Sequence, residues 1–248
     1  MNNPYGVEAM WSQGDAIIKV VAIALLIMSV ASWYVIVVRS WRLNRLRSAE
    51  AALQDFWHEH SFSEAVELLG DGKDNPFREL AETGEAAVVH HVNHKDDLHG
   101  HMPLADWVTA CMKGSIDESA ERLQRGLAIL ASVGSTAPFI GLFGTVWGIY
   151  HALVGIGMSG QASIDKVAGP VGEALIMTAF GLAVAIPAVL GYNALARSNK
   201  GVIGKLNRFA HQLHAYLLTG APPAPKKSSN PDVVAKISGR KQRQQEAR

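Results

Sequence analysis

Four polar side chains interrupt two otherwise apolar stretches of the chain, and their spacing suggests an ion path through a membrane. Thr145 and His151 lie in one stretch, and Glu173 and Thr178 lie in the other. A carboxylate inside a bilayer is costly unless it is protonated, paired or hydrated. Glu173 is therefore expected either to line an ion path or hold a partner helix, or to make a structural hydrogen bond inside a bundle.

The two threonines are expected to lie at the same depth in the membrane. Thr145 is ten residues from Gly155, and Thr178 is nine residues from Gly169, the two outer ends of a helical hairpin. At 1.5 Å per residue both are about 14–15 Å deep, near the middle of a ~30 Å hydrocarbon core. They either line a pore or bond to the carbonyl four residues earlier in their own helix.

His151 and Glu173 share a second level, because each lies four residues from its outer end. They are interpreted either as a titratable pair or, for His151, as a separate structural hydrogen bond or interface contact. Glu173 and Thr178 are five residues apart, or roughly 140° around a helix. Either the cavity that they line is wide, or Glu173 points partly toward a neighbouring subunit.

Three stretches of the chain are long and apolar enough to cross a bilayer. They cover residues 17–38, 127–155 and 169–195, and their only acidic or basic side chains are Lys19, His151 and Glu173. A signal peptide is disfavoured for the first stretch, because Arg39 and Trp41 follow it in place of a small-residue cleavage site. The predicted fold class is all-α: an integral membrane protein with three transmembrane helices extended into a cytoplasmic helical region, assembled as an oligomeric bundle.

The basic residues orient these spans. They follow the first and third spans and precede the second: Arg39, Arg42, Arg45, Arg47, Arg122, Arg125, Arg197, Lys200, Lys205 and Arg208. The positive-inside rule then places residues 1–16 and the loop 156–168 in the periplasm. Residues 39–126 and the segment after the third span lie in the cytoplasm, so the C-terminus is cytoplasmic.

The cytoplasmic parts are expected to be helical. Ser61 followed by Glu64 has the spacing of a capping box, which marks a helix start. Further helices are expected over residues 42–60, 77–92, 104–125 and 196–220, of which 104–125 could run directly into the second span. The tail 221–248 is basic and rich in proline, so it is expected to be disordered and suited to anionic lipid headgroups.

Glycines recur every seven residues in the second span, and Gly144 forms a GxxxG step with Gly148. In lipid, small residues let helix backbones approach closely. This pattern is expected either for ordinary packing of one hairpin or, with small residues on several faces, for contact with other copies of the chain. The packing glycines are Gly134, Gly141, Gly144, Gly148, Gly155 and Gly181.

Composition excludes several classes of protein. With 23 Lys and Arg against 22 Asp and Glu, the net charge of +1 argues against a nucleic-acid binder. The single cysteine, Cys111, excludes an internal disulfide. No nucleophile–base set or phosphate loop is present, so neither an enzyme nor a cofactor is expected. A metal site is not expected either, and one histidine-rich segment is interpreted as a solvated linker: His90, His91, His94, Asp96, Asp97, His99 and His101.

Two blocks of sequence carry a resemblance to a known family. The blocks are APFIGLFGTVWGIYHAL, residues 137–153, and GPVGEALIMTAFGLAVAIPAVLGYN, residues 169–193. Together they resemble the proton-channel family that includes ExbB, TolQ and the flagellar stator protein MotA, with the ExbB and TolQ branch nearest. The three-span topology extends this resemblance over most of the chain.

The resemblance implies a homopentamer in the inner membrane of a Gram-negative bacterium. Its pore would hold the transmembrane helices of an ExbD-like partner with a proton-accepting aspartate. Proton-motive force would then act through a TonB-like protein on outer-membrane uptake of iron–siderophore complexes or vitamin B12. Glu173, Thr145 and Thr178 occupy the places of the family's functional glutamate and pore threonines. A TolQ-type subunit of the Tol–Pal system and a passive membrane scaffold are the alternatives.

Overall fold

Every regular element in the described part of the chain is a helix, as predicted for an all-α protein. The computed structural model describes residues 15–70, 75–94, 101–159 and 164–221, and none of these residues forms a strand. The helices are α2 (Ala16–Asp55), the short 3-10 helix η1 (Phe56–His58), α3 (Phe62–Leu68), α4 (Pro76–Asn93), α5 (Leu104–Gln124), α6 (Leu127–Ser159) and α7 (Ile164–Thr219). The expected basic tail and most of the N-terminal segment 1–16 lie outside the described residues.

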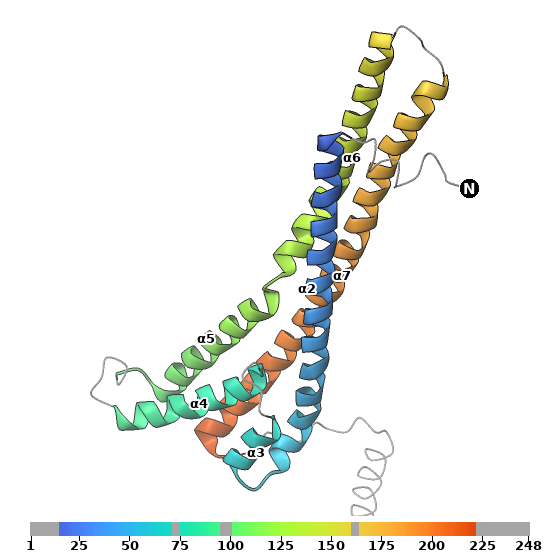
Figure 1. The fold of residues 1–248 in the computed structure, drawn as a ribbon. Coiled ribbons are helices and arrows are strands. Elements are labelled where there is room, and N and C mark those ends of the chain that lie inside the picture. Colours follow the sequence, from blue (N-terminus) through green and yellow to red (C-terminus); the bar gives the residue numbers. More distant parts are fainter. Residues whose placement is uncertain (1–14, 71–74, 95–100, 160–163, 222–248) are drawn as a thin grey trace, which may run out of the picture.

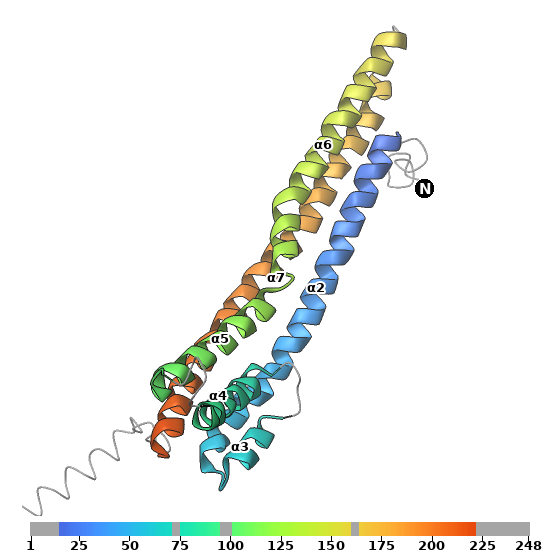
Figure 2. The ribbon, with the colours of Figure 1, turned by 90° about the vertical axis from the view of Figure 1, so that its left-hand side faces the viewer.

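The molecule is an elongated rod with a broader end. α2, α6 and α7 run side by side along the rod, and α3, α4 and α5 gather around the lower parts of α2 and α7 (Figures 1 and 2). Three helical stretches are long and apolar enough to cross a membrane. Large apolar side chains such as Val20, Leu26 and Leu190 are exposed on them. Such a continuous apolar surface is expected where lipid covers a protein.

α7 is one helix of 56 residues, although separate elements were expected over residues 169–195 and 196–220. At 1.5 Å per residue it is about 84 Å long, which is far more than one bilayer requires. α2 likewise continues 40 residues without a break, as expected for the segment that follows the first span. These two helices join the apolar part of the rod to its broad end without a break.

On the other side of the hairpin, α5 and α6 are separate helices, so the expected direct run of residues 104–125 into the second span is wrong. The break falls at Arg125 and Gly126, where Gly126 has φ +85°, a conformation that favours glycine. Two side chains bind the carbonyls left free at the end of α5. The Nδ2 of Asn199 in α7 donates to the oxygen of Leu123 at 2.7 Å, and Nη1 of Arg39 in α2 donates to that of Arg122 at 3.2 Å.

The broad end has its own core of aromatic side chains. Phe56, Phe77 and Phe209 come from η1, α4 and α7, and each is almost fully buried. The ring centroid of Phe209 lies 5.1 Å from that of Phe56 and 6.3 Å from that of Phe77, in edge-on arrangements that aromatic pairs prefer. The lower half of α7 is thereby fixed to the helices around it.

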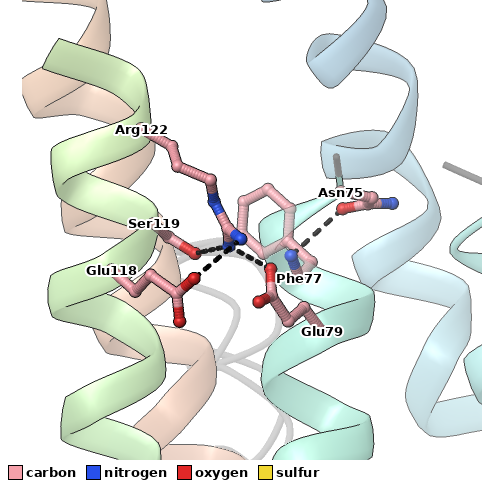
Figure 3. Close-up of polar contacts among 6 residues, drawn as sticks. All are labelled: Asn75, Phe77, Glu79, Glu118, Ser119 and Arg122. Carbon is pink, nitrogen blue, oxygen red and sulfur yellow. Dashed lines mark hydrogen bonds and ion pairs between the residues drawn. The ribbon is translucent and has the colours of Figure 1, made fainter. Parts of the chain in front are cut away.

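α3 and α4 begin with side-chain caps. Ser61 Oγ accepts a hydrogen bond from the Glu64 N–H at 3.2 Å, which confirms the predicted helix start. Asn75 Oδ1 accepts from the Phe77 N–H at 3.0 Å, one residue before Pro76 at the first helical position (Figure 3). Such caps satisfy backbone donors that a helix leaves free at its N-terminus.

Arg122 ties α5 to α4 beside the break in the hairpin. Its guanidinium forms an ion pair with Glu79 of α4 and contacts Glu118 and Ser119 of its own helix (Figure 3). The Arg122 side chain is only partly exposed, so these contacts are screened less than those of a fully solvated pair. The carbonyl of the same residue binds Arg39, so Arg122 links three helices.

The histidine-rich segment begins inside α4 rather than in a linker, because α4 continues to Asn93. The rings of His90 and His94 are stacked with centroids 4.5 Å apart, and the ring of Trp107 lies 5.8 Å from that of His90. Among the described residues no group of three His, Cys, Asp or Glu side chains is placed to hold a metal ion. Asp96, Asp97 and His99 lie outside the described residues.

Replacing Asn199 by alanine is expected to destabilise the junction between α5 and α6. Asn199 is buried, so its loss leaves the Leu123 carbonyl without this donor, at a cost of about 1–3 kcal/mol. Thermal unfolding in detergent, followed by circular dichroism, measures the effect. Asn207→Ala in the same helix is the matched control, because Asn207 is exposed and bonds only within α7. Equal midpoints for the two variants would contradict the role given to Asn199.

Candidate functional site

α6 and α7 pack so closely that two glycines face each other across the contact. A Cβ atom added at Gly141 would lie 2.6 Å from the carbonyl oxygen of Met177, and one added at Gly181 would lie 2.7 Å from that of Ala137. Both distances are too short for any side chain, and the obstacle in each case is backbone. The structure therefore brings together Gly141 and Gly181, both predicted as packing residues.

The other predicted packing glycines of α6 differ in the helices that they contact. Gly134 faces Val189 of α7, while Gly144 and Gly148 face both α7 and α2, through Val21 and Ile18 respectively on the α2 side. Gly155 has open space around it. The seven-residue repeat thus follows the contact between α6 and α7 over three of its four members, and no described residue lies within 4 Å of a Cβ added at Gly155.

The two predicted threonines meet at this contact. Thr145 is 6% exposed, and its Oγ1 lies 2.5 Å from Oγ1 of Thr178. The same oxygen is 2.9 Å from the carbonyl oxygen of Ala174 in α7 and 3.1 Å from that of Gly141 in α6. The back-bond in the same helix, one of the two expectations, is present. The threonines also contact each other across the two helices, which was not predicted, and a pore-lining role stays a prediction.

The number of hydroxyl hydrogens limits which of the two threonines donates in the bond between them. A hydroxyl has one hydrogen to donate, and both carbonyl oxygens beside Thr145 can only accept. If the Thr145 hydrogen is directed at Ala174 and Gly141, the hydroxyl of Thr178 must donate to Thr145. Thr178 is only half-buried, so the short chain of hydroxyls leads from a partly accessible oxygen to a buried one. Such a pair offers hydrogen-bond donors and acceptors to a polar group inside an apolar contact between two helices.

Glu173 lies in α7 beside Ala174 and five residues before Thr178. Its side chain lies outside the described residues, so its expected place on an ion path stays a prediction. Its position along α7 puts it on the side of the threonine pair that leads to the outer end of the hairpin.

His151 is paired with a residue of α2. Its Nε2 lies 3.3 Å from Oδ2 of Asp15, and its ring stacks on that of Trp147 with centroids 6.2 Å apart. Both partners of the ion pair are partly exposed. Asp15 is thus the described polar contact of His151, while the expected role of His151 and its pairing with Glu173 stay predictions.

For three contacts in and near the site, the sequence does not indicate which residues lie together. Asp15 lies just before the first apolar stretch, and its spacing does not relate it to His151. Gly191 faces α2, where an added Cβ would lie 2.6 Å from Cγ1 of Ile36. Asn199 binds a carbonyl 76 residues away. Polar or small residues at the edges of apolar stretches were the available signal, but the sequence does not say which helix each one meets.

The fold and the site together define a class of protein. This is an all-α membrane protein whose two closely packed spans hold a hydrogen-bonded hydroxyl pair inside their contact. Residues 80–208 match the model of the MotA/TolQ/ExbB proton channel family. The matched segment covers α5, α6, most of α4 and much of α7, and therefore the whole threonine site.

Related proteins cover nearly the whole chain. A biopolymer transport protein ExbB of Xanthomonas campestris is 43% identical over 220 residues, or 86% of this chain and 87% of the relative. An ExbB of Neisseria meningitidis is 42% identical over 213 residues, covering 85% and 96%. A Tol-Pal system protein TolQ of Pseudomonas aeruginosa is 34% identical over 218 residues, covering 84% and 92%. The chain belongs to the MotA/TolQ/ExbB proton channel family, whose members are proteins of the bacterial inner membrane.

Replacing Gly141 by alanine is expected to force α6 and α7 apart and to destabilise the protein by at least about 1–3 kcal/mol, the usual cost of overpacking. The thermal midpoint in detergent measures this change. Gly155→Ala is the matched control on the same helix, because its added methyl group meets nothing. A Gly141→Ala protein as stable as the Gly155→Ala protein would show that the backbone contact does not hold the hairpin.

Proposed function

We propose that the chain is an inner-membrane proton-channel subunit of the ExbB type. With an ExbD-like subunit in the pore of a homopentamer, it would use proton-motive force to energise TonB-dependent uptake through the outer membrane, of iron–siderophore complexes or vitamin B12. The N-terminus and the α6–α7 turn would face the periplasm. The observation that carries this proposal is the hydrogen-bonded pair Thr145 and Thr178 in the contact between two helices that are apolar enough to span a membrane.

The threonine pair suits a channel that depends on a partner. Hydroxyls can hydrogen-bond a proton carrier or water, but they do not ionise in the physiological range, so a relay needs an acid beside them. The spans of this chain supply no Asp or Glu at the threonine level, since Glu173 lies nearer the outer end. The missing acid would come from the partner's helix in the pore.

The relatives favour the ExbB role over the TolQ role. Identity to proteins named ExbB reaches 42–43%, against 34% for the TolQ of Pseudomonas aeruginosa. The arrangement of basic residues supports the topology. Arg39, Arg122 and Arg197 all lie at the end of the apolar bundle where α5, α4 and α3 gather, as the positive-inside rule expects of a cytoplasmic face.

Removal of either central hydroxyl is expected to impair energised uptake without preventing assembly. Thr145→Val and Thr178→Val keep the shape of the side chain but lose the contact between helices. An increase of about 1.4 kcal/mol in the activation free energy of the rate-limiting step makes uptake tenfold slower. Each variant is expected to raise this activation free energy by at least that much. Cells that depend on this chain and its partner for growth on scarce iron provide the measurement.

Thr136→Val is the matched control for these variants. Thr136 is an exposed threonine of α6 whose Oγ1 bonds only to the Ser132 carbonyl in its own helix, at 2.7 Å. It is expected to support normal uptake. Normal uptake in Thr145→Val, Thr178→Val and Glu173→Ala, with equal amounts of protein in the membrane, would favour a passive scaffold instead.

The purified chain alone is expected to conduct protons poorly, because it lacks an acid at the level of the threonines. Proteoliposomes with an imposed pH gradient and an internal pH-sensitive dye measure the flux. Liposomes that also contain the ExbD-like subunit should conduct faster, and replacement of that subunit's membrane aspartate by asparagine should remove the gain. Fast flux through the chain alone would contradict the requirement for a partner.

A further inference from the structure

Asp15 and His151 join two helices at the end of the rod where α6 and α7 turn. Asp15 immediately precedes α2, and His151 lies in the outer part of α6, with 3.3 Å between Oδ2 and Nε2. We infer that this pair is a pH-sensitive clasp, which holds the first turn of α2 against α6 when His151 is protonated and loosens it when His151 is neutral.

The geometry of Asp15 supports this assignment. Asp15 is the N-cap residue of α2, with extended backbone at φ −60° and ψ 160°, yet its side chain makes no capping hydrogen bond. An N-cap aspartate normally accepts from the N–H groups two or three residues later. Here the carboxylate lies toward His151 of α6 instead, so the start of α2 is fixed to another helix rather than to its own backbone.

The clasp lies at the end of a row of apolar contacts. Within the first two turns after Asp15, Ile18 and Val21 are buried against Gly148 and Gly144 of α6. These glycines offer no side chain to grip α2, and attraction between apolar helices in lipid is weak. A polar link at the end of the row therefore has a large share in deciding whether the first turn of α2 stays on α6.

The charges around the pair determine the sign of the pH effect. On α2 the nearest described cation is Lys19, one turn after Asp15; on α6 the neighbours of His151 are Trp147 and Tyr150, which carry no charge at neutral pH. The side chains of Asp165, Lys166 and Glu173 on α7 lie outside the described residues.

Imidazole is the side chain whose charge ordinarily changes near neutral pH. Protonation of His151 places a positive charge 3.3 Å from the Asp15 carboxylate and so makes the contact an ion pair, which a neutral imidazole cannot form. The clasp is accordingly stronger when His151 is charged than when it is neutral, as long as Asp15 keeps its negative charge. The inference rests on the proposed function in one respect only. With the proposed topology, the Asp15–His151 pair faces the periplasm, the side from which protons enter.

Hydrogen exchange in the first turns of α2 tests the clasp in the full-length chain in lipid nanodiscs. After correction for the intrinsic effect of pH, the amides of residues 19–22 should be about two- to fivefold more protected at pH 6 than at pH 8, the range for a partly exposed ion pair. Asp15→Asn and His151→Asn should each abolish this ratio. Lys19→Gln should keep it, and amides of the buried residues 202 and 206 in α7 serve as an internal reference.

Three results would overturn the inference. One is an equal protection of α2 at both pH values in the unmodified chain, and another is an unchanged ratio in His151→Asn. The third is a ratio that persists in Asp15→Asn but disappears in Glu173→Gln, which would assign the titration to a pair between His151 and Glu173. None of these measurements requires the partner subunit or proton flux, so their outcome is independent of the growth assay.

Discussion

The contact between the backbones of Gly141 and Gly181 is the constraint on which the membrane part of this protein depends. Lipid is as apolar as the helices it surrounds, so two spans associate through close packing and weak polar contacts. With no Cβ on either glycine, the carbonyl of Met177 and that of Ala137 approach the opposite helix directly. Thr145 lies one turn after Gly141 and Thr178 three residues before Gly181, so the same approach brings their hydroxyls to 2.5 Å.

This close contact is extended toward the broad end of the rod by the long helices rather than by the hairpin as a whole. α7 runs without interruption from the turn to the aromatic core around Phe209. On the other side, the chain breaks at Gly126, and the freed carbonyls of α5 are bound by Asn199 and Arg39. The broad end is therefore anchored to α7 and α2, while α5 and α6 are joined by the two residues Arg125 and Gly126.

The sequence predicted the elements well because their signals are local. Long apolar runs gave the three spans, and Ser61 with Glu64 gave the start of α3. Counting at 1.5 Å per residue was enough to place Thr145 and Thr178 at one level, since both helices are regular through this region. The break at Gly126 was not predicted, because a single glycine between two helical patterns is compatible with continuation and only tertiary contacts decide its conformation.

Pairings between helices were harder to predict, because they depend on rotation about each helix axis as well as on depth. Depth alone suggested Glu173 for His151, whereas the described contact of His151 is with Asp15 of a third helix. The position of α2 around the hairpin decides this. α2 lies over Gly144 and Gly148, and that side of α6 also carries His151, six residues beyond Thr145. A resemblance in sequence identifies which residues matter without giving this rotation.

One short segment of α6 therefore serves two contacts. Thr145 faces α7 through its hydroxyl, its neighbour Gly144 receives Val21 of α2, and His151 binds the residue at which α2 begins. Because protein interiors are closely packed, a shift of α2 at Gly144 would alter the fit of α6 on α7 one residue away. The polar pair at the end of the bundle and the hydroxyl pair at its centre therefore share one stretch of α6, about six residues, or roughly 9 Å of helix, apart.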